Sequence, residues 1–418
     1  MRSRHVPDAA AVVDIDLHGF AHGGEAVGRL PSGKACFVPY AIPGERVRVA
    51  VVDERRRWAR AQLLEVLEPS PDRVQPPCPY FGPDRCGGCR LQHIAPARQA
   101  RLKQAVVAEQ LTHLGRIGDP PVADTVRVAD RGYRSTARFA VDEDGRLGFR
   151  KPASHEVQPV DVCLLLSDAA QATRDEAGDG WAGVAEVTVR AGSAGGRGLV
   201  VTPGAGALPP LPPGDLPVAL RDAGGATVAL RGDATVVEEV GGVRYRVSPG
   251  SFFQPGAVGA AALLRLVREA AAVRAGEQVL DLYAGVGLFA RALAADGGDV
   301  VAVEADPSAC DDARANLAEV GARVECDDVR RVLERRDAAD VVVLDPPRKG
   351  AGPATSRRIA ELDPRVVVYV SCDPAALARD AAAFVAVGYR LAAAVPVDQF
   401  AHTAQIETVA TFVPQLGR

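Results

Sequence analysis

The sequence predicts an α/β protein of three parts: a small OB-like β-barrel over residues 1–70, a mixed α+β region over 71–245, and a doubly wound, Rossmann-like domain over 246–418. Three observations support this division. Short alternating strands separated by glycine turns fill the first part. Cysteines crowd together near the start of the second. In the third, apolar strands alternate with amphipathic helices, which is typical of a parallel sheet covered on both faces.

The composition is that of a soluble globular protein, with 47% hydrophobic and 24% charged residues among 418. No apolar run approaches the ~20 residues of a membrane span. The N-terminal stretch "MRSRHVPDAAAVVDID" lacks the sustained apolar segment and cleavage site of a signal peptide. We therefore expect a cytoplasmic protein.

The predicted barrel begins at Val12 with "VVDIDLHGFAHGGEAVGRL" and closes near Glu68. Several short strands at close spacing are typical of such barrels. The proline-rich "PSPDRVQPPCP" that follows predicts a linker. The first 150 residues hold 23 Lys and Arg against 18 Asp and Glu, and the remainder holds 26 against 35. This split is a mild indication of an anionic partner for the N-terminal half.

The central region predicts a helix in "PARQARLKQAVVAEQLTHLG", which ends at Gly115. The Gly- and Pro-rich stretch over 191–215 predicts loops. Cys78, Cys86 and Cys89 form a local group, which in a chain of a reducing compartment indicates a metal site before disulfides. Cys163 offers a fourth thiolate. Zinc and an iron–sulfur cluster are both compatible with four thiolates.

In the third part, the first strand leads into "DLYAGVGLFA", where Gly285, Gly287 and Ala290 have the G-x-G-x-x-A spacing of a tight turn beneath a ligand. The next strand ends at Glu304, 23 residues after Asp281, where a carboxylate can accept hydrogen bonds from ribose hydroxyls. The two signals together indicate a cofactor that contains adenosine. They leave NAD and S-adenosylmethionine both open.

Three later strand ends carry reactive side chains. Asp345 precedes two prolines at the tip of one strand, either as a rigid turn or as a carboxylate held against a planar base. Cys372 follows the next strand, at the carboxyl edge where open α/β sheets bind ligands. A buried structural thiol is the alternative for Cys372. Glu407 begins the last apolar strand and becomes a candidate base if Cys372 lies opposite.

With these residues in view, the sequence resembles the RNA uracil-C5 methyltransferases (the TrmA/RlmD group), including actinobacterial members, over nearly the whole chain. Residues 12–68, notably "VPYAIPGERV", resemble the TRAM barrel of that family. The segment "CPYFGPDRCGGCRLQH" resembles its iron–sulfur segment, and "YRSTARF" with "LGFRKPASHEVQPVDVC" its central domain. Five further motifs match in order: "SFFQ", "DLYAGVG", "DPPR", "SCDPAALARD" and "IE".

The resemblance implies S-adenosylmethionine as cofactor and assigns roles to individual residues. The cofactor-binding residues that it implies are Gln254, Tyr283, Gly285, Glu304, Asp345 and Asp328 or its neighbour Asp327. Asp345 would orient the uracil and face the base rather than the thiol, Cys372 would attack carbon 6, and Glu407 would remove a proton. Cys78, Cys86, Cys89 and Cys163 would hold a [4Fe–4S] cluster, with zinc as the alternative.

The chain departs from the family pattern at a few positions. Leu288 stands where some members carry Asn, and "SCDP" replaces the commoner "SCNP". Cys36, Cys310 and Cys326 are interpreted as core or surface residues without a role. His93, His113 and His402 lack ligand spacing and are assigned none.

The expected product is 5-methyluridine in rRNA or tRNA, with RNA as the partner of a monomer. Arg134 and Arg138 are candidate RNA contacts, with a solvated strand face as the alternative. The rival functions are an amino-group nucleic-acid methyltransferase, which needs neither Cys372 nor Glu407, and a non-catalytic RNA-binding protein. An NAD enzyme would leave the later motifs without a role.

Overall fold

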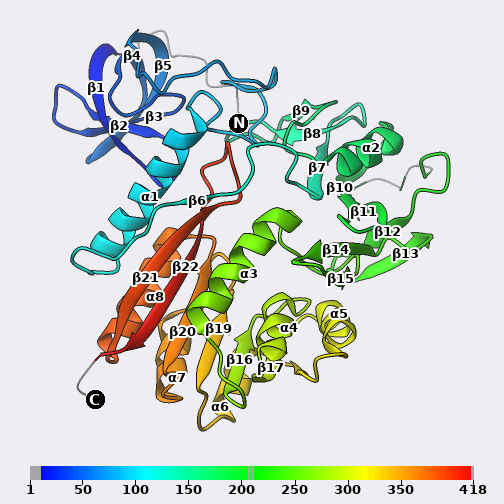
Figure 1. The fold of residues 1–418 in the computed structure, drawn as a ribbon. Helices are drawn as coiled ribbons and strands as arrows, with labels where there is room; N and C mark the ends of the chain where they lie inside the picture. The colour runs from blue at the N-terminus through cyan, green and yellow to red at the C-terminus, as the bar shows by residue number, and fades with distance from the viewer. Residues whose placement is uncertain (1–10, 206–207, 209–210, 416–418) are drawn as a thin grey trace.

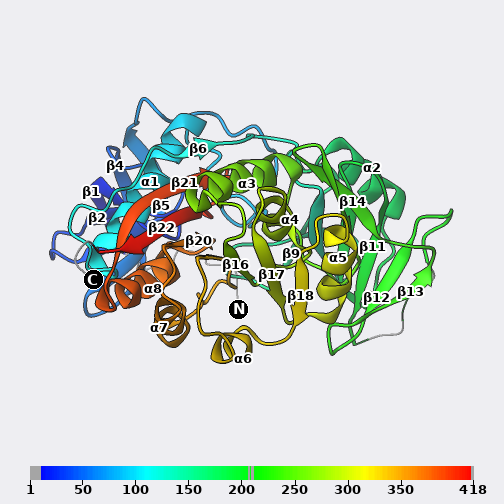
Figure 2. The same cartoon turned by 60° about the horizontal axis from the view of Figure 1, so that its bottom comes forward.

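The computed structural model describes residues 11–205, 208 and 211–415. It has three bodies: a barrel, a central sheet, and a larger sheet sandwiched between helices (Figure 1). A second view shows helices on both sides of the larger sheet, with the central sheet to one side (Figure 2). The prediction about the N-terminal segment falls partly on residues 1–10, outside the described residues.

The barrel is closed, as predicted, with the strand order β1-β2-β3-β5-β4. Its strands are β1 (Val12–Phe20), β2 (Ala26–Arg29), β3 (Ala35–Val38), β4 (Arg46–Glu54) and β5 (Trp58–Glu68). Alternating residues such as Ile15, Leu17, Val47 and Val49 fill its interior. Gly28 is required where β2 crosses β1, because an added Cβ would lie 2.6 Å from the Asp16 carbonyl oxygen.

The central body is a seven-stranded sheet of order β13-β12-β11-β10-β7-β8-β9, with helix α2 (Asp168–Ala177) packed on it. The strands are β7 (Thr136–Val141), β8 (Leu147–Arg150), β9 (Val157–Pro159), β10 (Val184–Ala191), β11 (Arg197–Pro203), β12 (Val218–Arg221) and β13 (Thr227–Arg231). A separate hairpin, β14 (Val236–Val240) and β15 (Val243–Val247), leads to the C-terminal body.

The prediction of loops over 191–215 was partly wrong, because β11 lies inside this stretch. Its sequence "RGLVVTP" contains an apolar run that pairs with β10 over seven residues. Gly198 is necessary there, since an added Cβ would lie 2.8 Å from the Ala234 side chain. The surrounding glycines and prolines concealed a core strand.

The C-terminal body is an eight-stranded sheet of order β18-β17-β16-β19-β20-β22-β21-β6. Its strands are β6 (Val126–Arg127), β16 (Gln278–Leu282), β17 (Asp299–Glu304), β18 (Arg323–Cys326), β19 (Val341–Leu344), β20 (Val366–Ser371), β21 (Tyr389–Asp398) and β22 (Glu407–Pro414). The expected parallel arrangement holds from β18 to β20. Strand β22 runs antiparallel to both of its neighbours, because a direct loop joins it to β21.

Helices cover both faces of this sheet, which confirms the doubly wound prediction. One face carries α1 (Pro96–His113), α6 (Val329–Glu334), α7 (Pro353–Glu361) and α8 (Pro374–Ala386). The other carries α3 (Ala257–Ala271), α4 (Leu288–Ala295) and α5 (Pro307–Leu317). Within the described residues, no helix has the length and apolar character needed to cross a membrane.

Helix α1 and strand β6 belong to this body, although both come from the predicted central region. Val107 and Leu111 of α1 pack in the core beneath the sheet. Lys103, which is 1% exposed, donates a 2.5 Å hydrogen bond to Asp398 at the end of β21. This buried ion pair fixes the start of the loop that leads from β21 to β22.

Candidate active site

A cleft of about 820 Å³ lies where the barrel, the central sheet and the C-terminal sheet meet. Cys372 lines it, together with the exposed ring of Phe252. Two carboxylates, Glu238 and Asp373, also face it. The arginines that line it are Arg90, Arg134, Arg138, Arg190, Arg221 and Arg348. The excess of arginine makes the cleft suited to a polyanion.

Cys372 follows β20 at the carboxyl edge of the sheet and is partly exposed, so it is not a core thiol. The next residue, Asp373, turns the chain into α8 by accepting a hydrogen bond from the Ala376 N–H. Burial raises the pKa of Cys372 to about 12, and the negative charges of Glu407 and Asp345 contribute to that rise. The resting thiol is therefore protonated at neutral pH.

Glu407 lies beside Cys372 because β22 runs antiparallel between β20 and β21. Its neighbour Thr408 pairs with Ser371, the last residue of β20, so Glu407 lies opposite Cys372, the residue that follows β20. Glu407 is 4% exposed, and its Oε2 has no hydrogen-bond partner among the described residues. Burial, followed by the charge of Asp345, raises the pKa of Glu407 well above its usual range. This carboxyl therefore holds a proton more tightly than an ordinary glutamate does.

A chain of two buried amides leads to Asp345. Gln399 donates to the Oε1 of Gln254 at 3.0 Å, and Gln254 donates to Asp345 at 3.1 Å. Desolvation raises the pKa of Asp345 to about 7. We expected Asp345 to face away from the thiol, but its charge also raises the pKa of Cys372. The three acidic groups Asp345, Cys372 and Glu407 therefore form one electrostatic unit.

Sequence reasoning missed two further residues that act on this unit, Arg348 and Gln399. Arg348 lines the cleft, and its positive charge lowers the pKa of both Cys372 and Glu407. Its position directly after Asp345-Pro346-Pro347 was an available signal. No sequence signal pointed to Gln399. Its loop is fixed by the ion pair between Lys103 and Asp398, which the sequence does not reveal.

The glycine turn after β16 has the geometry of a ligand-binding loop. Tyr283, Gly285 and Gly287 all have positive φ angles. An added Cβ on Gly285 would meet nothing within 4 Å, so open space lies above its backbone. Beneath the turn, the fully buried Asp281 accepts a hydrogen bond from Ala290 N–H, and burial raises the pKa of Asp281 to about 8.

Glu304, at the end of β17, is held rigidly by the backbone. Its Oε2 accepts from Gly285 N–H at 2.9 Å, and its Oε1 accepts from the amides of Ala305 and Asp306 at 2.7 and 2.8 Å. A carboxylate has about four acceptor positions, so one remains for a hydroxyl of a bound ligand. The acid lies next to the glycine turn, as the sequence predicts.

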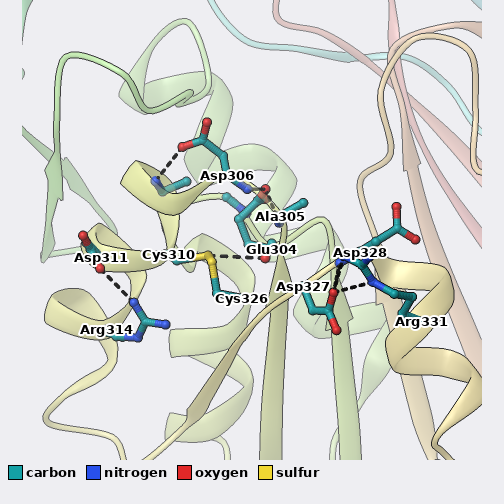
Figure 3. Close-up of a disulfide and its surroundings, with 12 residues drawn as sticks. Glu304, Ala305, Asp306, Cys310, Asp311, Arg314, Cys326, Asp327, Asp328 and Arg331 are labelled. Atoms are coloured by element: carbon teal, nitrogen blue, oxygen red, sulfur yellow. Dashed lines mark hydrogen bonds and ion pairs between the residues drawn. A yellow bond between two sulfur atoms is a disulfide. The ribbon is translucent and has the colours of Figure 1, made fainter. Parts of the chain in front are cut away.

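Asp327 and Asp328 have different surroundings, and their carboxylates point in different directions (Figure 3). Asp327 accepts hydrogen bonds from Arg331 and Arg335 and is thereby occupied. Asp328 caps α6 and pairs with the exposed Arg330 at 3.3 Å, and its charge raises the pKa of Tyr283. Of the two alternatives, Asp328 is therefore the one whose charge reaches the glycine turn.

Cys310 and Cys326, which we had assigned no role, form a disulfide between α5 and the end of β18 (Figure 3). Cys326 pairs in register with Glu304, and α5 begins three residues after Glu304. Their Cα atoms are 5.8 Å apart, within the range of disulfide geometry. The bond ties α5, which follows the loop after Glu304, to the end of β18, which precedes Asp327 and Asp328.

The four cysteines that were predicted to hold a metal lie together. Cys78, Cys86, Cys89 and Cys163 line a single small cavity of about 50 Å³. Burial raises the pKa of Cys86 to about 11 and of Cys89 to about 12. Within the described part of the chain, no three His, Cys, Asp or Glu side chains are placed to hold one metal ion.

The chain is similar to several known protein families and proteins. Residues 11–64 match the TRAM domain family, and residues 235–375 match the TRM5/TYW2 methyltransferase domain family. An uncharacterized RNA methyltransferase of Streptomyces coelicolor is 39% identical, over 96% of this chain and 92% of that protein. The 23S rRNA (uracil(1939)-C(5))-methyltransferase RlmD of Alkalilimnicola ehrlichii is 36% identical, over 96% of both chains.

Among solved structures, the Pyrococcus abyssi tRNA (uracil-54, C5)-methyltransferase in complex with S-adenosyl-L-homocysteine superposes with a TM-score of 0.73 at 26% identity. The match covers 96% of this chain and 100% of that chain. All three bodies of the fold are therefore shared with this enzyme.

Proposed function

Because the chain belongs to the RNA uracil-C5 methyltransferase family and is thus an S-adenosylmethionine-dependent RNA methyltransferase, we propose that it forms 5-methyluridine through a covalent adduct between Cys372 and carbon 6 of the target uracil. The observation that carries this proposal is that strand register brings the buried Glu407 beside Cys372, which lines an arginine-rich cleft. An amino-group methyltransferase would need neither residue. The target is a uridine of ribosomal or transfer RNA.

The residues around the glycine turn fit S-adenosylmethionine. The open space above Gly285 admits a ligand close to the backbone, and Glu304 keeps an acceptor position for a ribose hydroxyl. We assign Tyr283 and Asp328 to the same site, with Gln254 and Asp345 at its border with the cleft. When bound, this cofactor supplies a methyl group on a positively charged sulfur.

Cys372 performs the first chemical step. Carbon 5 of uracil is a poor nucleophile, so the Cys372 thiolate forms a bond to carbon 6, and the electrons of the C5–C6 double bond move to give an enolate. The enolate takes the methyl group at carbon 5. Cysteine suits this role because it is intrinsically nucleophilic. Asp345, with a pKa of about 7, is matched to take the thiol proton near neutral pH.

Glu407 completes the reaction. It removes the proton that remains on carbon 5, the double bond re-forms, and the bond between carbon 6 and Cys372 breaks. A carboxyl with a raised pKa is a stronger base than an ordinary glutamate. Arg348, on the cleft wall, stabilises the negative charges that this cycle creates.

The RNA strand lies in the cleft in this proposal. Single-stranded RNA is recognised by arginines on its phosphates and by aromatic rings that stack on unpaired bases. Arg134 and Arg138 line the cleft, and the ring of Phe252 is 68% exposed. We assign these residues to the strand that carries the target uridine.

The four cysteines that line one cavity support a [4Fe–4S] cluster held by Cys78, Cys86, Cys89 and Cys163. Zinc sites commonly use two closely spaced cysteine pairs. This chain has one such pair, Cys86 and Cys89, with two isolated cysteines, so we favour a cluster over zinc. Its role is to hold the central region in place.

Methylation of RNA from a deletion strain tests the function directly. The purified protein, incubated with that RNA and labelled S-adenosylmethionine, should produce 5-methyluridine in a nucleoside digest, at one position of ribosomal or transfer RNA. A Cys372→Ala variant should produce none. Label on an amino group of adenosine or cytidine would favour the rival methyltransferase. An absence of label from every nucleoside would favour the non-catalytic RNA-binding protein.

A further inference from the structure

A second cavity, of about 740 Å³, lies between the barrel and the cysteine-bearing segment. The barrel contributes Tyr40 and Arg60 to its wall, and the segment contributes Phe81 and His93. Gly23 and Arg90 line both this cavity and the cleft that holds Cys372. The two spaces are therefore neighbours across one rim. The proposed catalysis makes no use of the second cavity, and the cysteine cavity shares Phe81 with it.

The wall of this cavity is aromatic. The rings of Tyr40 and Phe81 meet edge to face at 5.5 Å, and Phe81 stacks on His93 at 5.8 Å. Tyr40 and Phe81 are only partly buried. The Tyr40 hydroxyl donates to the Gly82 carbonyl oxygen at 3.0 Å, which fixes the ring against the segment. A partly exposed, fixed aromatic wall is a stacking platform for a planar ligand.

The rim of the cavity carries three arginines and two carboxylates. Arg60 and Arg90 are exposed, while Arg73 is already paired with the buried Glu45 at 2.6 Å. Arg90 donates one hydrogen bond to the Gly23 carbonyl oxygen at 2.9 Å, which holds its guanidinium at the boundary between the two spaces. A guanidinium carries five N–H donors, so Arg90 keeps donors for a phosphate. Two carboxylates, Glu25 and Asp84, also line the cavity, and Glu25 lies 3.8 Å from Arg60.

His93 adds an acceptor to the wall. It is 3% exposed, and its Nε2 lies 3.4 Å from the Ala41 carbonyl oxygen, to which it donates. The Nδ1 atom is then an acceptor, and it has no partner among the described residues. The acceptor suits the amino groups of a nucleotide base, and the aromatic wall suits its ring. The exposed arginines of the rim suit its phosphate.

We propose that this cavity binds an unstacked nucleotide of the substrate RNA, on the strand that leaves the catalytic cleft over Arg90. The inference rests on the proposed function, because it takes the cleft as the RNA site. The occupant follows from the continuity of the two spaces, the aromatic wall and the arginine rim. Aromatic stacking with arginine contacts is the usual way in which proteins hold single-stranded RNA. The barrel thereby reads the strand beyond the target uridine.

Binding of fluorescently labelled oligouridylates to the full protein tests this site. The probes are oligomers of about 12 and about 4 nucleotides, since only the longer one can span both spaces. Arg60→Glu and Tyr40→Ala should each weaken binding of the longer oligomer on the order of 10-fold, as expected for the loss of one stacked nucleotide. Neither should change binding of the shorter one. Arg46→Glu reverses a charge on the same barrel outside the cavity and should leave both affinities unchanged.

Two outcomes would overturn the inference. If Arg60→Glu and Tyr40→Ala leave the longer oligomer unaffected, the cavity has an occupant other than RNA. If they weaken both oligomers equally, the effect is not a second subsite. S-adenosylhomocysteine binding by each variant should equal that of the unmodified protein, which excludes misfolding. Failure of the proposed function would be distinct, because it would appear as absent methylation in the unmodified protein.

Discussion

Replacing Glu407 by Gln should lower the pKa of Cys372 and make its thiol more reactive. The pKa of the Cys372 thiol is raised from its ordinary value of 9.0 to about 12. The causes, largest first, are burial, the charge of Glu407 and the charge of Asp345. At pH 8 a pKa of about 12 leaves on the order of one thiolate in 10,000. Burial is the largest cause, and the charge of Glu407 is the next. The variant should therefore hold more thiolate at each pH at which Glu407 of the unmodified protein is ionised.

Alkylation of Cys372 by iodoacetamide reports the thiolate directly. In the unmodified protein, the rate should rise about tenfold per pH unit and show no plateau below about pH 10. Glu407→Gln should react faster, and the difference should grow as the pH rises and Glu407 of the unmodified protein ionises. Arg348→Gln removes the charge that lowers the pKa of Cys372, so it should react more slowly. The peptide that carries Cys372 is quantified by mass spectrometry, with the buried Cys36 as an internal reference.

The test is strict because the two variants should change the rate of Cys372 alkylation in opposite directions. A general loosening of the site would speed alkylation in both, whereas the electrostatic account requires one to accelerate and the other to slow. A plateau below about pH 9 in the unmodified protein would refute the reasoning, because it would mean that the thiol is not destabilised as an anion.

Three further predictions concern stability and cofactors. Protein purified without oxygen should be brown with about four iron per chain; Cys86→Ser should lose the colour and Cys36→Ala should keep it, whereas a colourless, fully active protein with one zinc would contradict the cluster. Reduction of the bond between Cys310 and Cys326, which lie 16 residues apart, should lower the free energy of unfolding by about 3 kcal/mol, measured by urea titration; two additional free thiols without reductant would show that the bond is absent. Lys103→Met leaves the buried Asp398 carboxylate without its partner and should lower the free energy of unfolding by about 3 to 5 kcal/mol. Adding Asp398→Leu should recover most of that loss. A Lys103→Met variant as stable as the unmodified protein would exclude the buried pair.

Much of the fold could be predicted from the sequence because its signals are local. Alternating apolar residues predict the barrel strands, and continuous apolar runs such as Val366–Ser371 predict the strands of the large sheet. The reactive residues Asp345 and Cys372 follow such strands directly. Parallel strands bring their carboxyl ends to one edge, so pattern alone placed both at the site.

What the sequence could not show depends on contacts between distant residues. Lys103 and Asp398 are 295 positions apart, and no sequence pattern indicates their ion pair. The strand β11 was concealed by glycines whose purpose is close packing. The disulfide was missed because Cys310 and Cys326 approach only when β17 and β18 pair. In each case tertiary structure, not local preference, decides the arrangement.

The central claim is that Cys372 bonds to carbon 6 before Glu407 removes the carbon-5 proton. The most direct test uses RNA with 5-fluorouridine at the target, because fluorine replaces that proton and elimination cannot proceed. A protein–RNA adduct should then survive a denaturing gel, should carry the methyl label, and should disappear in Cys372→Ser. Glu407→Gln should form the same adduct with ordinary uridine, because the base is missing. A trapped species that persists in Cys372→Ser, or normal turnover by Glu407→Gln, would contradict the account.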